Sequence, residues 1–160
     1  MKNAIFFNIV GGTMDLGEVI FGISEFVKLK SKRRYKIIVG TDSAARSETN
    51  FITAITAWRV GNGAIHFWTR SKTTKCHDLR DRIYQETIHS ITLAQELRGR
   101  LKETLGDEFF WDDQIHIDVG EKGPTREFID AVVGMVKGYG FDAVIKPNSF
   151  GASVVADRHT

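Results

Sequence analysis

The stretch YKIIVGTDS, residues 35–43, decides the fold class of this chain. Its first part, residues 35–39, is apolar and rich in residues that favour β-structure, which is typical of a central strand buried on both faces. The polar part that follows places Asp42 just past the carboxyl end of this strand. We therefore predict a buried strand that ends in a carboxylate, at the position where open α/β folds place their ligand sites.

The segments around this strand alternate between strand and helix patterns. Two β-rich runs follow it, separated by Gly61-Asn62-Gly63, whose Asn-Gly step suits a tight hairpin turn. Apolar residues then recur at helical spacing until Gly106, a residue type that commonly ends helices. The expected elements are, in chain order, a helix over 16–29, strands over 35–39, 51–60 and 64–70, a helix over 78–105, a strand over 115–119, a helix over 125–139, a strand over 143–145 and a last short helix after Pro147. This order predicts an α/β fold with a mixed five-stranded sheet, β-β-β-α-β-α-β-α, behind an N-terminal helical prefix.

Length and composition are those of one globular domain. The chain has 160 residues, of which 42% are hydrophobic and 26% charged, close to the average for folded proteins and unlike disordered or coiled-coil chains. We expect a single domain over 1–160, with an extension over 1–34 and a core over 35–160. Cys76 is the sole cysteine, so no disulfide forms within the chain, and the apolar segment 4–10 is too short to span a bilayer. Both features favour the cytoplasm and no membrane contact.

Positive charge gathers in one segment although the total is nearly neutral. Lys and Arg number 22 against 20 Asp and Glu, which gives a net charge of +2. Residues 28–36 carry a run of basic side chains and no acid. This run is a candidate contact for nucleic acid, because cations neutralise phosphates. The alternative is a solvated linker before the strand.

Two acids are expected at the same edge of the sheet. If the first three strands pair in sequence and a helical crossover follows, the strand over 115–119 runs parallel to the strand over 35–39 and beside it. Asp42 and Asp118 then meet at the carboxyl ends of these strands. The alternative for each acid is that it caps a turn or a helix, a common role of Asp after a strand.

Glu86 falls inside the apolar face of the helix expected over 78–105. A buried carboxylate needs a cation, a metal ion or a proton beside it, and the alternative here is an ion pair with Arg82. Close carboxylates repel one another unless a divalent cation neutralises them, and a set of oxygen ligands suits Mg²⁺ or Mn²⁺. The histidines show no zinc-ligand spacing. Two such ions typically promote in-line displacement at phosphorus.

The element order and the positions of the acids resemble the ribonuclease H-like superfamily. More narrowly, the chain resembles the YkuK family of that superfamily in the segments 37–43 (IIVGTDS), 85–87 (QET), 116–120 (HIDVG), 133–137 (VGMVK) and 154–159 (VVADRH), so that the similarity covers roughly residues 35–160. The resemblance implies a ribonuclease H-like fold, a phosphodiester substrate and a site for two Mg²⁺ or Mn²⁺ ions, whose ligands are Asp42, Glu86, Asp118 and Asp157.

Three functions are compatible with these patterns. The first is a metal-dependent nuclease that cleaves RNA, an RNA/DNA hybrid or structured DNA by a two-metal carboxylate mechanism. The second is a non-catalytic module of the same fold that binds nucleic acid or protein. The third reads residues 39–43 as the phosphate loop of a sugar-kinase or actin-like ATPase, although neither G-x-x-x-x-G-K-[ST] nor G-x-G-x-x-G occurs. Further candidates for phosphate contact beside the acids are Ser43, Lys146, Arg158 and His159.

Overall fold

The computed structural model describes residues 3–151 and 156. The strands are β1 (Phe6–Asn8), β2 (Thr13–Met14), β3 (Tyr35–Ser43), β4 (Glu48–Thr49), β5 (Phe51–Arg59), β6 (Ala64–Arg70), β7 (Thr74–Lys75), β8 (Asp112–His116) and β9 (Asp142–Val144). The helices are α1 (Leu16–Leu29), α2 (Leu79–Leu105), the 3-10 turn η1 (Arg126–Phe128) and α3 (Ile129–Gly138). None of the described helices is both long enough and apolar enough to cross a membrane.

The main sheet has seven strands in the order β2-β1-β6-β5-β3-β8-β9, and β4 and β7 form a separate two-stranded sheet. The five expected strands are present in this sheet as β6, β5, β3, β8 and β9. The pair β3–β8 is parallel, as the connections predicted. The expected total of five was wrong, because the extension before α1 adds β1 and β2. Phe6 pairs with Thr69 and is fully buried, so this segment covers the edge of β6 that would otherwise be open. Most pairs are antiparallel; β3–β8 and β8–β9 are the parallel ones.

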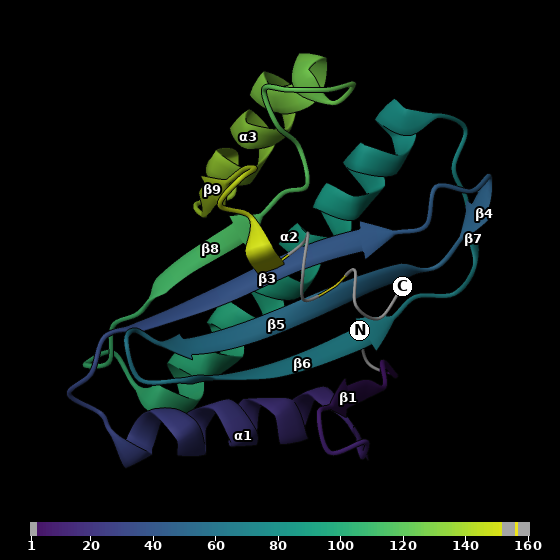
Figure 1. Cartoon of the computed structure of the whole chain (residues 1–160). Helices are drawn as coiled ribbons and strands as arrows, with labels where there is room; N and C mark the ends of the chain where they lie inside the picture. The colour runs from purple at the N-terminus through teal and green to yellow at the C-terminus, as the bar shows by residue number, and fades with distance from the viewer. Residues whose placement is uncertain (1–2, 152–155, 157–160) are drawn as a thin grey trace.

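The two faces of the sheet have different covers (Figure 1). Residues of α1, α2 and α3 pack with Ile37 and Val39 of β3 in the larger hydrophobic core, and Figure 1 shows α2 behind the sheet. The described residues that follow β9, 145–151, lie in front of it. There, Ala156 is fully buried in a smaller cluster with Ile52 and Ala54 of β5. Alternate residues of β3 and β5 therefore face opposite covers.

Both acids lie at other positions relative to the strand ends than the sequence predicted. Strand β3 extends to Ser43, so Asp42 lies inside it, because β5 pairs with it over the full length from Tyr35 to Ser43. Strand β8 begins and ends earlier than expected, and Asp118 follows its last residue, His116. The helix expected over 125–139 is divided into η1 and α3.

Helix α2 confirms its expected limits. Its N-terminal cap is Asp78, whose side chain accepts a hydrogen bond from the amide of Asp81 at 2.8 Å. Gly106 ends the helix with a φ of 80°, a conformation that a side chain would oppose. The last helix expected after Pro147 falls mostly on residues outside the described part; Phe150, Gly151 and Ala156 have helical backbone.

Candidate functional site

The parallel register of β3 and β8 brings Asp42 and Asp118 to the same level. Gly40 is the partner of His116 in this register, and each acid lies two residues further along its chain. Both acids therefore lie on the same face, at the carboxyl ends of neighbouring parallel strands. Asp42 is 9% exposed. The parallel pairing of β3 and β8, from which the sequence predicted this juxtaposition, is confirmed.

Glu86 reaches the same edge of the sheet from α2. It is buried, and its carboxylate accepts a hydrogen bond of 2.6 Å from the hydroxyl of Ser43. Ser43 and Thr41 both face α2, since the hydroxyl of Thr41 lies 2.7 Å from that of Ser90 on the helix. Asp42, between them, faces the other way. Ser43, expected at a phosphate, is therefore found holding Glu86.

The pKa of Glu86 is raised from 4.5 to about 8, first of all because burial penalises its charged form. The negative charges of Asp42 and Asp118 raise this pKa further, while the Ser43 hydrogen bond and Arg82 lower it. The Arg82 ion pair that the sequence offered as an alternative is weak, with Nε 4.0 Å from the Glu86 carboxylate. The three carboxyl groups therefore act on one another electrostatically, and at neutral pH Glu86 holds a proton.

Asp118 has an incomplete set of partners. Lys146 Nζ lies 2.9 Å from its Oδ1, yet that buried oxygen has no partner of acceptable hydrogen-bond geometry among the described residues. The contact is therefore an ion pair without hydrogen-bond geometry, and its lysine side chain is still half exposed. Gly120 makes room for this lysine, since a Cβ there would lie 3.1 Å from the Lys146 Cβ. An anionic oxygen that is shielded from water and poorly bonded suits a cation as a further partner.

The described residues test only part of the expected metal site. Residues 3–151 and 156 contain no group of three His, Cys, Asp or Glu side chains placed to hold a metal ion. In the described conformation Ser43 holds Glu86 on the α2 side of β3, away from the face of Asp42. The other expected residues Asp157, Arg158 and His159 lie outside the described part. The donor chemistry nevertheless fits Mg²⁺ or Mn²⁺, because all three placed groups are carboxylates and one of them has a buried oxygen that accepts no hydrogen bond from the described residues.

His116 belongs to the surroundings of the site, and the sequence analysis did not identify it. It lies two residues before Asp118 on the same face and is 2% exposed. Burial, assisted by the charge of Lys36, lowers its pKa to about 4. The amide of Gly151 donates to Nδ1 at 3.0 Å, so Nε2 carries the proton and donates to Gln114 at 3.1 Å. The sequence held a signal for this position. Apolar and polar residues alternate over 115–118, which places His116 on the same face as Asp118.

The contact of Gly151 with His116 ties the chain after β9 to the sheet and predicts a sensitive position. A Cβ at Gly151 would lie 2.8 Å from Ile38 Cγ2 and 3.2 Å from His116 Nδ1. We expect Gly151→Ala to lower the free energy of unfolding by about 1–3 kcal/mol, the usual cost of overpacking. Chemical denaturation measures this change.

The control for Gly151→Ala is another glycine without neighbours. Gly99 lies within α2, and a Cβ there would meet nothing within 4 Å. Gly99→Ala is expected to raise the free energy of unfolding by about 0.5–1 kcal/mol, because Ala favours the helix. Equal effects of the same sign at both positions would contradict the described packing of Gly151.

The basic run over 28–36 lies at the other end of the sheet, away from the acids. It precedes and begins β3, whereas Asp42 and Ser43 end that strand, and Figure 1 shows these ends on opposite sides of the molecule. At about 3.3 Å per residue, β3 separates them by roughly 25 Å. Arg34 instead pairs with Asp112 at 3.1 Å. The run is therefore not adjacent to the acids, and its role as a contact for nucleic acid stays a prediction.

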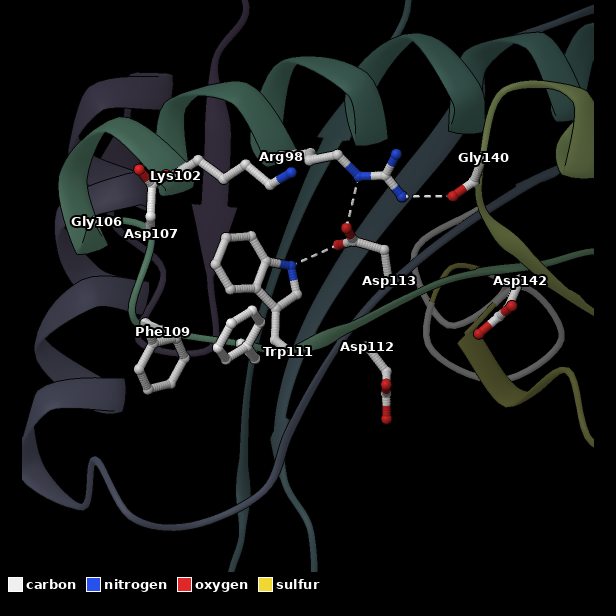
Figure 2. Close-up of a pocket in the computed structure, with 11 residues that line it drawn as sticks. Arg98, Lys102, Gly106, Asp107, Phe109, Trp111, Asp112, Asp113, Gly140 and Asp142 are labelled. Carbon is white, nitrogen blue, oxygen red and sulfur yellow. Dashed lines mark hydrogen bonds and ion pairs between the residues drawn. The ribbon is translucent and has the colours of Figure 1, made fainter.

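A cavity of about 520 Å³ lies at this distant end of the sheet (Figure 2). Its walls include Arg98, whose side chain binds Asp113 at 2.7 Å and the carbonyl of Gly140 at 2.7 Å. The indole of Trp111 donates to the same Asp113 at 2.6 Å. The polar groups of this trio satisfy one another, so we assign them to stabilising the junction of α2, β8 and α3 and not to the candidate site.

A mixed α/β sheet with two carboxylates at the ends of neighbouring parallel strands, and a third on the helix behind, defines the class of protein. A model of the Ribonuclease H-like family matches residues 18–160. The "Uncharacterized protein YkuK" of Bacillus subtilis (strain 168) is 32% identical to this chain over 169 residues, which cover 98% of the chain and 96% of that protein. No solved structure gives a significant match. The chain belongs to the ribonuclease H-like family, and this membership supports a nucleic-acid-related function.

Proposed function

We propose that this protein is a metal-dependent nuclease that hydrolyses phosphodiester bonds of RNA, an RNA/DNA hybrid or structured DNA. One observation carries the proposal: Asp42 and Asp118 lie level at the carboxyl edge of the sheet, and both raise the pKa of the buried Glu86. Folding such groups together opposes stability, so their juxtaposition favours a functional role over a structural one. The family supports nucleic acid as the substrate class.

The residues of the site have separate tasks in this proposal. Asp42 and Asp118 supply carboxylate oxygens for Mg²⁺ or Mn²⁺, and Asp157 is proposed to join them. Bound ions would supply activation of water and stabilisation of the leaving oxygen at phosphorus. Ser43 orients Glu86, whose proton must leave before its carboxylate can serve as a further ligand.

The cations beside the site are proposed to meet the substrate. Lys146, already 2.9 Å from Asp118, is half exposed and can turn towards a phosphate when a stronger cation takes its place. Arg158 and His159 are proposed for the same task from their position in the sequence.

The experiment is a titration of Mn²⁺ and of Mg²⁺ into the full chain, followed calorimetrically, and then cleavage assays under the binding conditions. Labelled single-stranded RNA, RNA/DNA hybrid and branched DNA are the substrates. Metal binding together with cleavage of one of them is the expected result. Binding of these nucleic acids without any metal-dependent cleavage would refute the nuclease.

A second function is favoured by the Lys146 contact. Its ammonium group already places a positive charge at the buried Oδ1 of Asp118. A permanently paired Asp118 would suit a non-catalytic module that binds nucleic acid or protein. Lys146→Met separates the two functions, because it should strengthen Mn²⁺ binding if the lysine yields to a metal ion and leave the protein without metal affinity if the module is non-catalytic.

A further inference from the structure

Two oppositely charged segments lie side by side at the end of the sheet that is distant from the acid site. The basic segment is the run over 28–36, with six cations and no acid, and the acidic segment is 107–113, with four acids and no cation. The parallel register brings them together, since Lys36 is the partner of Asp112 at the start of β3 and β8. Figure 1 shows these two strand starts at the same end of the molecule. This end therefore carries a positive and a negative surface next to each other.

Several of these charges have no partner of opposite sign among the described residues. The described part of the chain has one ion pair between the two segments, which joins Arg34 to Asp112 at 3.1 Å. Four exposed side chains of the segments form no ion pair with any described residue, namely Lys32, Arg33, Asp107 and Glu108. Like charges that are concentrated in a short segment repel one another, so each segment favours an oppositely charged surface on a partner.

Each segment also exposes one large apolar side chain. Leu29 is 79% exposed and Phe110 is 84% exposed. Phe110 and Trp111 line the cavity of Figure 2, whose walls hold four Asp and two cations. One of these cations, Arg98, is already bound to Asp113. Aromatic rings beside carboxylates suit a cationic side chain from outside, so the acidic segment fits a basic protein surface.

The arrangement side by side decides the kind of partner. A second copy of this chain carries both charges in the same arrangement. A twofold axis between the segments places the basic segment of each copy on the acidic segment of the other, so that both contacts form at once. Copies joined head to tail would need the two segments on opposite sides of the molecule. The association therefore closes at two copies.

We propose that two copies of this chain form a closed dimer through the reciprocal contact of residues 28–36 with residues 107–113. The contact lies roughly 25 Å from Asp42, at the opposite end of β3, so it covers neither acid site. The dimer does not depend on the proposed nuclease activity. A nucleic-acid strand is the competing occupant of the basic segment, and the test distinguishes the two.

The test measures the mass of the full chain at increasing concentrations by sedimentation equilibrium, with nucleic acid absent. We expect an equilibrium between monomer and dimer with a dissociation constant in the micromolar range, because a contact between two short segments is at the small end of interface sizes. Added salt should weaken the dimer, since the Debye length falls from about 10 Å at 0.1 M to about 3 Å at 1 M.

Two charge reversals test the reciprocal contact. In a dimer, Lys32→Glu with Arg33→Glu places acids opposite acids, and Asp107→Lys with Glu108→Lys places cations opposite cations. Each variant alone should be monomeric, because like charges then face one another. An equimolar mixture of the two variants should form a mixed dimer. In that pair one contact is wild type and the other has its charges exchanged, so both contacts attract.

The matched control is Arg46→Glu with Lys72→Glu. It makes the same change of charge at two exposed cations that follow the carboxyl ends of β3 and β6. The control should dimerise like the wild type, within about twofold in the dissociation constant, since these positions are far from the contact. An equal loss in the control would assign the effect to net charge and overturn the proposal.

Thermal unfolding shows whether each variant is folded. If a reversal unfolds the protein, Lys32→Gln with Arg33→Gln or Asp107→Asn with Glu108→Gln replaces it and should weaken the dimer by about tenfold. A wild type that stays monomeric, a dimer that persists in either reversal, or a mixture of folded reversals that stays monomeric would overturn the proposal. A monomeric wild type that binds an oligonucleotide, and loses this binding in Lys32→Glu with Arg33→Glu, would assign the basic segment to nucleic acid instead.

Discussion

Asp42→Asn is expected to remove the proposed metal-dependent cleavage while leaving the protein folded. Asn keeps the shape of the side chain but loses the negative charge that a divalent ion requires. We expect the cleavage rate to fall by more than about 100-fold, because even changes in groups that merely support a metal ligand cost about 10- to 100-fold. Initial rates on the preferred substrate, at saturating Mn²⁺, measure the loss.

The control for Asp42→Asn is Asp142→Asn, which makes the same chemical change at an exposed acid on β9, at the distant end of the sheet. Its rate should stay within about twofold of wild type, since surface substitutions far from a site have small effects. Asp118→Asn should lose as much as Asp42→Asn. A variant at Asp42 that still cleaves at the wild-type rate would remove this acid from the site.

Glu86→Gln is expected to stabilise the protein, and more so at alkaline pH. In the folded chain the pKa of Glu86 is raised to about 8, whereas the unfolded chain titrates near the ordinary value of 4.5. Between these two values the folded state holds a proton that the unfolded state has lost. The stability of the wild type therefore falls as the pH rises through this window, and the full penalty is present above pH 8.

Denaturant titrations between pH 7 and 9 measure this effect in a window that avoids His116, whose pKa is lowered to about 4. The wild type should lose about 1 kcal/mol over these two units, and Glu86→Gln should lose none of it. At pH 9 the variant should be more stable than the wild type by a few kcal/mol. Gln can still accept the hydrogen bond from Ser43, so the packing is kept.

The control for Glu86→Gln is Glu103→Gln, an exposed glutamate on the same helix, α2. It should leave the pH dependence of the wild type unchanged. A wild-type stability that is flat between pH 7 and 9 would show that Glu86 is ionised in the folded protein at neutral pH. Saturating Mn²⁺ should reduce the dependence, since metal binding displaces a proton from its ligand.

Much of the fold follows from local patterns. The Asn-Gly turn predicted the hairpin of β5 and β6, and Asp78 and Gly106 marked the limits of α2. Strands β1 and β2 escaped prediction because they are short and form only by tertiary pairing, β1 with β6 and β2 with β1. Strand β3 was predicted too short for a related reason. Its polar end, Thr41 and Ser43, is buried by hydroxyl contacts with α2, and these contacts are made by tertiary packing.

The positions of the acids, too, were predictable only in part. The parallel neighbourhood of β3 and β8 follows from the order of elements, and it predicted that Asp42 and Asp118 would meet. The partner of Glu86 was not predictable. Arg82 lies one turn away on the same helix and Ser43 on the facing strand, and only the way the helix packs on the sheet makes the serine the closer of the two. The four-carboxylate metal site and its ions stay predictions.

The sequence by itself determined the class of fold, the edge of the sheet at which acids gather and the family to which the chain belongs, because periodicity, turn residues and short motifs are local properties. Tertiary structure alone decided where the positive charge lies relative to those acids. The run over 28–36 is dense in the sequence but lies at the far end of β3, whereas Arg46 and Arg70 are separated in the sequence and share one depression. Electrostatic attraction depends on distance in space, and the register of β3, β5 and β6 sets that distance.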